Sequence, residues 1–251
     1  MKKSFYDDLS FSYPKYWQKR KYEHFSEAIA LKRLFELIPS SSRGDLIDIG
    51  AGFGRLAEIY LKSFKRCVLI DPSRKLLTRA KKNLKGEKNV EFRLGTVEKI
   101  PFKEGIFDLV VMIRVAHHLE DLEKAFNEIS RVLKPGGFFI LEFANKNHFK
   151  AKLFSPFSSY QRQKAFCLDP IDISSKKRKI PFINYHPLWI KKEVEKSNFK
   201  VITKLSVSNL RFSGFEKLLP LKLLIWIERN FQPFLGKIDF GPSIFLLLRK
   251  K

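Results

Sequence analysis

Three glycines and one aspartate form the clearest chemical pattern in the chain. The segment LIDIGAGFG places Gly50, Gly52 and Gly54 directly after a short apolar run, and Asp71 ends the next apolar run. Glycines let the backbone turn sharply and approach a ligand closely, and the N-terminus of a following helix offers unpaired N–H groups. A carboxylate at the end of the second strand can accept hydrogen bonds from both hydroxyls of a ribose. The pattern predicts a nucleoside-binding site.

The spacing of these glycines distinguishes two classes of ligand. A dinucleotide site reads G-x-G-x-x-G/A, and its last small residue lets the helix and the strand pack closely. Here the third glycine comes one position earlier, and Arg55 stands in the sixth position. The spacing therefore argues against a nicotinamide-dependent oxidoreductase.

Apolar runs and amphipathic segments alternate around this pattern and must position it. Strands are predicted at residues 45–49, 68–71, 90–94, 107–113, 138–143, 199–207 and 243–248, and helices at 17–38, 55–64, 73–84, 121–133, 187–197 and 215–231. The run FDLVVMI at 107–113 is typical of a strand buried on both faces. Strands joined by helices imply a parallel α/β sheet with right-handed crossovers.

Five segments, in order along the chain, carry a resemblance to a known family. They read LIDIGAGFG, VLIDPS, LGTVEKIPF, FDLVVMIRVAHHL and VLKPGGFFILE. With them the chain resembles the class I S-adenosylmethionine-dependent methyltransferases, of the broad type that acts on small molecules, lipids and quinones. The resemblance covers residues 13–145 well and 185–251 loosely. It implies an enzyme that uses S-adenosyl-L-methionine to methylate a small-molecule or lipid-like acceptor.

The resemblance also implies an architecture. We expect an α/β fold with a Rossmann-like doubly wound sheet of seven strands, mostly parallel with an antiparallel last strand, helices on both faces, and insertions after strands five and six. The expected parts are an N-terminal helical lid (1–44), a cofactor-binding core (45–144), an acceptor-side insertion (145–185) and a C-terminal part of the core (186–251) with an insertion at 208–240.

The same resemblance assigns the cofactor site. The implied residues are Tyr16, Arg20, Asp48, Gly50, Ala51, Gly52, Gly54, Arg55, Asp71, Pro72, Thr96, Val97 and Arg114. Tyr16 and Arg20 belong to YWQKRKYE, which resembles an N-terminal lid, and Arg20 and Arg55 are candidates to bind the cofactor carboxylate. The family usually has an acid where this chain has Thr96, whose hydroxyl can still accept a hydrogen bond.

Residues after the fourth apolar run face the acceptor in this fold. His117 and His118 are candidates for a general base, because an unperturbed imidazole titrates near neutral pH. Packing beneath the sheet edge is their alternative role. Arg114 is a candidate to bind an anionic acceptor, with a surface salt bridge as the alternative. Methyl transfer from a sulfonium needs no metal, and Cys67 and Cys167 lack the spacing of a zinc site, so no metal site is predicted.

The charge of the chain indicates an anionic partner. Its 251 residues include 49 Lys or Arg and 26 Asp or Glu, a net charge of +23, and residues 146–251 hold 22 basic and 7 acidic side chains. An RNA-modifying methyltransferase would use the basic run at 176–179 and the aromatic residues interleaved over 145–190. A non-catalytic cofactor-binding or membrane-surface protein of the same fold would lay the amphipathic helix at 215–231 on an anionic membrane. That helix could instead cap the sheet.

Cysteine content and hydropathy address where such a protein works. Two cysteines 100 positions apart fit a reducing compartment. The apolar stretch at 218–227 contains Lys222 and is shorter than the roughly 20 residues of a membrane span. We expect a cytoplasmic protein, either free or peripheral at a membrane surface. The sequence does not decide its oligomeric state.

Overall fold

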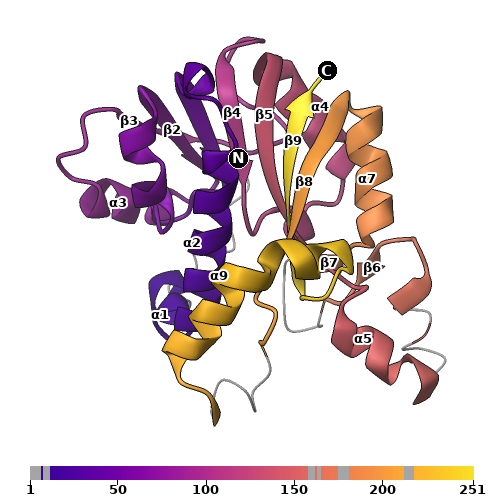
Figure 1. Ribbon diagram of the computed structural model, residues 1–251. Helices are drawn as coiled ribbons and strands as arrows, with labels where there is room; N and C mark the ends of the chain where they lie inside the picture. The colour runs from indigo at the N-terminus through magenta and orange to yellow at the C-terminus, as the bar shows by residue number, and fades with distance from the viewer. Residues whose placement is uncertain (1–6, 8–11, 158–161, 163–164, 175–180, 212–217) are drawn as a thin grey trace.

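A seven-stranded sheet forms the centre of the computed structural model, which describes residues 7, 12–157, 162, 165–174, 181–211 and 218–251 (Figure 1). The strand order is β3-β2-β1-β4-β5-β9-β8. The strands are β1 (Asp45–Ile49), β2 (Arg66–Asp71), β3 (Val90–Leu94), β4 (Phe107–Met112), β5 (Leu133–Ala144), β8 (Phe199–Val207) and β9 (Ser243–Lys250). Strands β1 to β5 pair in parallel, whereas β9 pairs antiparallel with both β5 and β8. The expected Rossmann-like sheet with an antiparallel last strand is confirmed.

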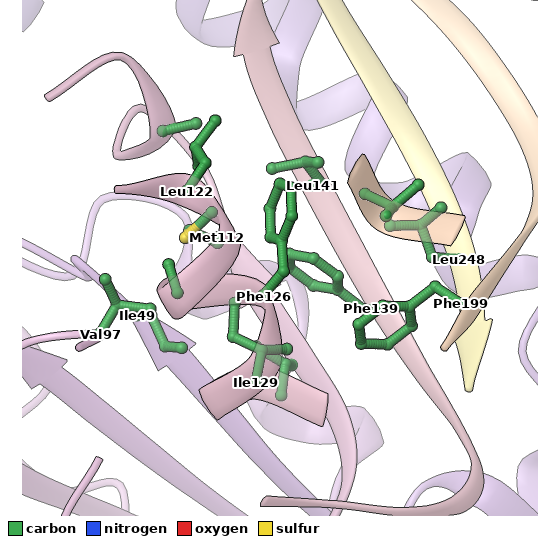
Figure 2. Close-up of a cluster of buried hydrophobic side chains, with 14 of the residues drawn as sticks. Ile49, Val97, Met112, Leu122, Phe126, Ile129, Phe139, Leu141, Phe199 and Leu248 are labelled. Atoms are coloured by element: carbon green, nitrogen blue, oxygen red, sulfur yellow. The ribbon is translucent and has the colours of Figure 1, made fainter. Parts of the chain in front are cut away.

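Side chains of the sheet alternate between two buried clusters, because successive residues of a strand point to opposite faces. In β4, Val110 and Met112 join one cluster, whereas Leu109 and Val111 join the other. Figure 2 shows part of the first cluster, in which the rings of Phe126 and Phe139 lie with their centroids 6.1 Å apart. Burial of both faces explains why the central strands read as continuous apolar runs.

Helices cover both faces of the sheet. Helices α4 (Leu122–Val132) and α7 (Pro187–Lys196) contribute to the first cluster, and α2 (Lys21–Glu36) contributes to the second. Helix α3 (Arg74–Asn83) packs against β2 and β3 at one edge. The Ser73 hydroxyl accepts the Leu76 N–H at 3.1 Å and so caps α3, as the Asp121 carboxylate caps α4.

Two stretches leave the core, one after β5 and one after β8. The first contains α5 (Phe149–Phe154) and a two-stranded sheet of β6 (Ile171–Asp172) and β7 (Ile183–Asn184). The second contains α9 (Leu221–Lys237). In Figure 1, α9, α5 and α1 (Tyr13–Gln18) lie beyond the same end of the sheet. Strand β9 runs away from that end of the sheet and is antiparallel to β5. Strands β1 to β5 therefore finish at the end where α9, α5 and α1 lie.

The prediction of an α-helix at residues 55–64 is wrong. Two short 3-10 helices occupy residues 57–59 and 61–63 instead. The Tyr60 N–H donates to the Ala57 carbonyl at 3.0 Å, three residues back along the chain. The buried side chains Ala57 and Tyr60, and then Leu61 and Phe64, are also three residues apart. Three residues per turn is the repeat of a 3-10 helix, so burial of these pairs favours it over the α-helix.

Two other helix predictions need smaller corrections. The helix predicted at 17–38 is two helices, α1 and α2, which are separated at Lys19 and Arg20. The helix predicted at 215–231 with a break at Pro220 does break there: α9 begins directly after Pro220, and it continues past the predicted end, through Pro233, to Lys237. Residues 215–217 and the basic run at 176–179 lie outside the described residues. Within the described part of the chain, none of the helices has the length and apolar character needed to cross a membrane.

Candidate functional site

The glycine segment after β1 bends back over the end of β2. The N–H groups of Gly50 and Ala51 both donate to the Ile70 carbonyl, at 2.8 and 3.2 Å. Gly52 has a φ of +58° and donates its N–H to Asp71 Oδ2 at 2.8 Å. A side chain with a Cβ rarely adopts this left-handed backbone. The close approach of loop and carboxylate therefore depends on glycine at position 52.

Asp71 ends β2 with its carboxylate held by two backbone donors. Its Oδ2 accepts the Gly52 N–H, and its Oδ1 accepts the Ser73 N–H at 2.7 Å. Only 5% of the residue is exposed, and this burial raises the pKa of the carboxyl to about 6. A carboxylate has about four acceptor positions, so Asp71 retains capacity for hydroxyl groups of a ligand.

A pocket lies beside this loop, where β1, β2 and β4 end. Its wall is formed by Tyr13, Ile49, Gly50, Gly52, Asp71, Pro72, Leu76, Gly95, Thr96, Val97, Glu98, Arg114, Val115, His118 and Leu119. The structure thus brings together segments that are far apart in the sequence. Among the residues that the sequence predicts for the cofactor, the wall includes Gly50, Gly52, Asp71, Pro72, Thr96, Val97 and Arg114.

Three other residues predicted for the cofactor lie behind the pocket wall. Asp48 is buried in β1 and accepts a hydrogen bond from the Tyr60 hydroxyl at 2.5 Å. Burial raises the pKa of Asp48 to about 7. Ala51 is engaged through its backbone, and Gly54 faces α3, where a Cβ would lie 3.6 Å from the Ala80 Cβ. These residues support the glycine loop and do not line the pocket.

A buried carboxylate connects the N-terminal helices to the glycine loop and to the end of β4. Glu27 of α2 is fully buried and accepts hydrogen bonds from Arg55 Nη2 and, at 2.7 Å, from Arg114 Nε. Burial alone would raise the pKa of Glu27, but the two guanidinium groups lower it overall. Both guanidinium groups also lie over the ring of Trp17 in α1, 3.5 and 5.1 Å from its centroid.

Arg55 is held by contacts with α1 and α2. Besides Glu27 and Trp17, its Nη1 lies 2.9 Å from His24 Nδ1. The side chain is 12% exposed and is absent from the pocket wall. Arg55 therefore fastens α1 and α2 to the glycine loop, and a cofactor carboxylate would have to displace these partners to reach it.

Arg114 is the arginine of the pocket wall. Its backbone has a φ of +64°, and its N–H donates to Glu142 Oε2 at 2.8 Å while its Nε donates to Glu27. Its Nη2 is buried and has no hydrogen-bond partner among the described residues. Leaving a buried donor unpaired is costly. This nitrogen is therefore suited to an acceptor atom of a bound ligand.

The two adjacent histidines have different surroundings. His117 is buried outside the pocket wall, and burial lowers its pKa well below 6.5. His118 lines the pocket, with its Nδ1 2.8 Å from the Pro181 carbonyl oxygen. A carbonyl oxygen only accepts, so Nδ1 carries the hydrogen, and Nε2 is the acceptor nitrogen of the neutral ring. Of the two, His118 has the position and the tautomer of a base that acts on a ligand.

Helix α1 places its aromatic residues differently from the sequence prediction. Arg20 lies over the Tyr16 ring, 4.4 Å from the centroid, and neither residue is in the pocket wall. Tyr13, one turn earlier on α1, lines the pocket, and its ring centroid is 5.9 Å from that of Phe53 in the glycine loop. Tyr13, Tyr16 and Trp17 are spaced to share one helix face. That spacing was the available signal for Tyr13.

Sequence reasoning also missed part of the segment after β3. Gly95 and Glu98 line the pocket on either side of Thr96 and Val97. A Cβ at Gly95 would lie 2.7 Å from Ile70 Cδ1, so the segment depends on glycine to lie this close to β2. No three His, Cys, Asp or Glu side chains lie close enough to hold a metal ion in the parts of the chain that the structure describes.

Comparison with known proteins identifies the core. Residues 47–141 match the family model for a methyltransferase domain. This segment is a methyltransferase domain. This range runs from β1 into β5 and holds the glycine loop, Asp71, the segment after β3, Arg114 and both histidines.

Relatives of the methyltransferase domain agree with this assignment. The chain is 33% identical over 119 residues to an uncharacterized methyltransferase, YcgJ, of Bacillus subtilis, covering 47% of each protein. It is 32% identical over 103 residues to a ubiquinone biosynthesis O-methyltransferase of Bradyrhizobium, covering 41% of this chain and 40% of that protein. The matches thus span about half, or less, of these curated relatives.

A solved structure shares the fold beyond the core. A S-adenosylmethionine-dependent methyltransferase from Mesorhizobium loti superposes with a TM-score of 0.62 at 16% identity, over 87% of this chain and 96% of that one. Its sheet and helices therefore have the same arrangement over most of the present chain.

S-Adenosyl-L-methionine is the cofactor of this domain family, and three features of the pocket bear on how it could be held. The Asp71 carboxylate retains acceptor capacity for hydroxyl groups. Thr96 and Val97 lie in the pocket wall. The buried Nη2 of Arg114 is a donor without a partner among the described residues.

Proposed function

We propose that the protein transfers a methyl group from S-adenosyl-L-methionine to a small-molecule or lipid-like acceptor. The observation that carries this proposal is one cavity whose wall contains Asp71, at the end of β2 beside the glycine loop, together with Arg114 and His118 after β4. When bound, the cofactor supplies an electrophilic methyl group on a sulfonium. The protein must then hold the acceptor in line with that methyl group, and such positioning can contribute roughly 7–11 kcal/mol.

In this proposal, Asp71 accepts hydrogen bonds from the ribose hydroxyls, and Thr96 and Val97 contact the adenine. Arg114 donates from Nη2 to a carboxylate in the pocket. Its direction is fixed beforehand by Glu27 and Glu142, which hold its Nε and its backbone N–H. A guanidinium positioned in this way loses little further freedom when it binds an anion.

His118 is the proposed general base for an acceptor that carries a hydroxyl. The Pro181 carbonyl sets the tautomer in which Nε2 can take a proton. His117 is proposed to have only a packing role, since it is buried next to Phe182, 4.5 Å between ring centroids.

The acceptor class is supported by the pocket and by the relatives. Aliphatic and aromatic side chains that are not assigned to the cofactor also line the pocket, namely Tyr13, Ile49, Leu76, Val115 and Leu119. The stretches at 145–185 and 208–240 are proposed to complete the acceptor side. The similarity to a ubiquinone biosynthesis O-methyltransferase favours a quinone-like or lipid-like molecule.

Two measurements test this function. In calorimetry, Asp71→Ala should weaken binding of S-adenosylhomocysteine at least about tenfold, whereas Glu195→Ala, an exposed carboxylate on α7, should leave it unchanged. Labelled S-adenosylmethionine is then incubated with lipid, RNA and metabolite fractions, and label in lipid or metabolites is expected. Binding that survives Asp71→Ala contradicts the site, and binding without transfer to any fraction favours a non-catalytic cofactor-binding protein.

A basic helix beside the pocket favours RNA as the second candidate acceptor. The exposed face of α3 carries Arg74, Lys75, Arg79, Lys81 and Lys82, and α3 contains no acidic residue. Leu76 of the same helix lines the pocket. If RNA is the acceptor, its affinity should fall steeply as salt rises, because phosphate contacts release counterions. An affinity that does not respond to salt would remove this candidate.

A further inference from the structure

Helix α9 has a polar side turned toward the protein. Its buried positions are Leu224, Glu228, Gln232 and Gly236. Glu228 Oε1 accepts hydrogen bonds from the Tyr22 hydroxyl at 2.5 Å and from the Asn209 N–H at 2.6 Å. Gln232 donates to the Ser26 carbonyl at 2.9 Å. A helix on a globular domain normally buries an apolar stripe, whereas α9 is attached largely through hydrogen bonds.

The opposite side of α9 is apolar and exposed to solvent. Trp226 is 56% exposed, Phe234 60% and Ile238, at the C-terminal end, 52%, and Leu223 and Phe231 are also exposed. Leu223, Trp226, the half-exposed Ile227 and Phe234 fall on one helix face by their spacing, and Asn230 is the polar residue among them. The helix thus presents to water the type of stripe that other helices of this protein bury.

Helix α5 continues this apolar surface. The ring of Phe149 stacks on Phe240, which follows α9, with 4.8 Å between centroids, and Lys152 Nζ donates to the Ile238 carbonyl at 3.1 Å. Leu153, Phe154 and Phe157 are exposed on and after α5. We define the α9–α5 patch as Phe149, Leu153, Phe154, Phe157, Leu223, Trp226, Phe231, Phe234 and Ile238.

The exposed charged side chains of α9 and α5 are all basic, and Asp239, which follows α9, is paired with Lys204 at 2.6 Å. Lys222, Arg229 and Lys237 are exposed along α9. The one acidic residue of α9, Glu228, is buried, and α5 contains none. Lysine and arginine can lay their aliphatic stems on an apolar surface while their charges reach an anionic one. Exposed aromatic residues that share two helices with exposed cations match the boundary between lipid headgroups and acyl chains.

We propose that the α9–α5 patch docks on the surface of an anionic lipid bilayer. Figure 1 shows α9 and α5 beyond the end of the sheet at which β1 to β5 finish, and the pocket lies at that same end. Docking there turns the pocket side of the molecule toward the lipid. The proposal concerns binding alone and does not depend on methyl transfer.

The test measures binding to vesicles of phosphatidylcholine, with and without phosphatidylglycerol, by co-sedimentation. We expect binding only to the anionic vesicles, and a loss of binding as salt rises. Trp226 serves as an internal reporter because Trp17 is buried and Trp189 is half-buried. Its fluorescence should shift to shorter wavelength on binding.

A variant separates the patch from the general charge of the protein. Leu223→Ser combined with Phe234→Ser keeps the net charge and the reporter, and should weaken vesicle binding at least about tenfold. The matched control is Leu37→Ser, which changes a residue that is 52% exposed and precedes β1 at the other end of the sheet. Equal thermal unfolding of the variants confirms that each is folded.

Three results would overturn the proposal. The first is the absence of binding to anionic vesicles by the unaltered protein. The second is equal binding by the double variant and the unaltered protein, which would assign the lipid contact to another basic face. The third is a concentration-dependent dimer that the double variant abolishes, without vesicle binding, which would assign the patch to a second copy of the chain.

Discussion

Binding of the cofactor should depend on the ionisation of Asp71. Burial raises the pKa of this carboxyl to about 6. Hydroxyl groups that donate to a carboxylate stabilise its ionised form, so a ribose binds the ionised protein better. With a pKa of about 6, roughly nine tenths of Asp71 is ionised at pH 7 and roughly one tenth at pH 5. If the ionised form is the one that binds, the dissociation constant should rise about tenfold over this interval.

Calorimetry with S-adenosylhomocysteine at pH 5, 6 and 7 measures this dependence. The Asp71→Asn variant keeps the size of the side chain and cannot titrate. At pH 7 it should bind about tenfold more weakly or worse, because hydrogen bonds to a charged group contribute about 1.5–3 kcal/mol and neutral ones about 0.5–1.5 kcal/mol. Between pH 7 and pH 5 its affinity should stay constant. Unchanged affinity of the unaltered protein, or an equal slope in the Asn variant, would refute the reasoning.

The remaining predictions concern buried charges and the two histidines. Glu27→Gln should lower the free energy of unfolding by about 3–5 kcal/mol, measured by urea titration, because two guanidinium groups lose their buried counter-charge. A loss below about 1 kcal/mol would contradict the role of Glu27 as that counter-charge. His118→Ala should reduce the rate of methyl transfer about 100-fold or more at neutral pH with little change in stability. His117→Ala should mainly lower the free energy of unfolding. The reverse pattern would make His117 the base and His118 the packing residue. Asp48 binds a proton more tightly when folded, with a pKa of about 7 against 3.8 unfolded, so its ionisation destabilises the protein as pH rises from about 4 to 7. The free energy of unfolding of Asp48→Asn, relative to that of the unaltered protein, should therefore increase by about 1–3 kcal/mol from pH 5 to pH 7. A difference in urea midpoints that stays constant over this range would contradict the raised pKa of Asp48.

Much of the sheet could be predicted because its strands are buried on both faces. The predicted boundaries of 45–49, 90–94 and 199–207 are those of β1, β3 and β8. Contiguous apolar residues, bounded by turn residues and charges, leave little ambiguity there. By contrast, the segment at 55–64 has an apolar pattern compatible with either helix type. The choice depends on which side chains the sheet buries, and one sequence does not contain that information.

The residues of the candidate site also fall into those that the sequence could place and those that it could not. Gly52 and Asp71 could be predicted because backbone geometry and strand ends fix their positions. Arg55 could not be placed, because its partners Glu27 and His24 are about 30 residues away and are brought to it by the packing of α2. The spacing of Tyr13 and Tyr16 places them on one helix face but does not decide which of them lines the pocket, since the turn at Lys19 and Arg20 sets how α1 meets the loop.

The pocket combines walls that belong to the sheet with one that belongs to a short helix. Asp71 and Arg114 lie on the sheet and its immediate extensions, whereas Tyr13 lies on a helix of six residues that is held by ring contacts and by Trp17 beneath Arg55 and Arg114. A small displacement of α1 would loosen these contacts and enlarge the cavity on that side without disturbing a strand. Nucleoside analogues with bulky additions should therefore be tolerated where they point toward Tyr13 and rejected where they point toward β1 or β2.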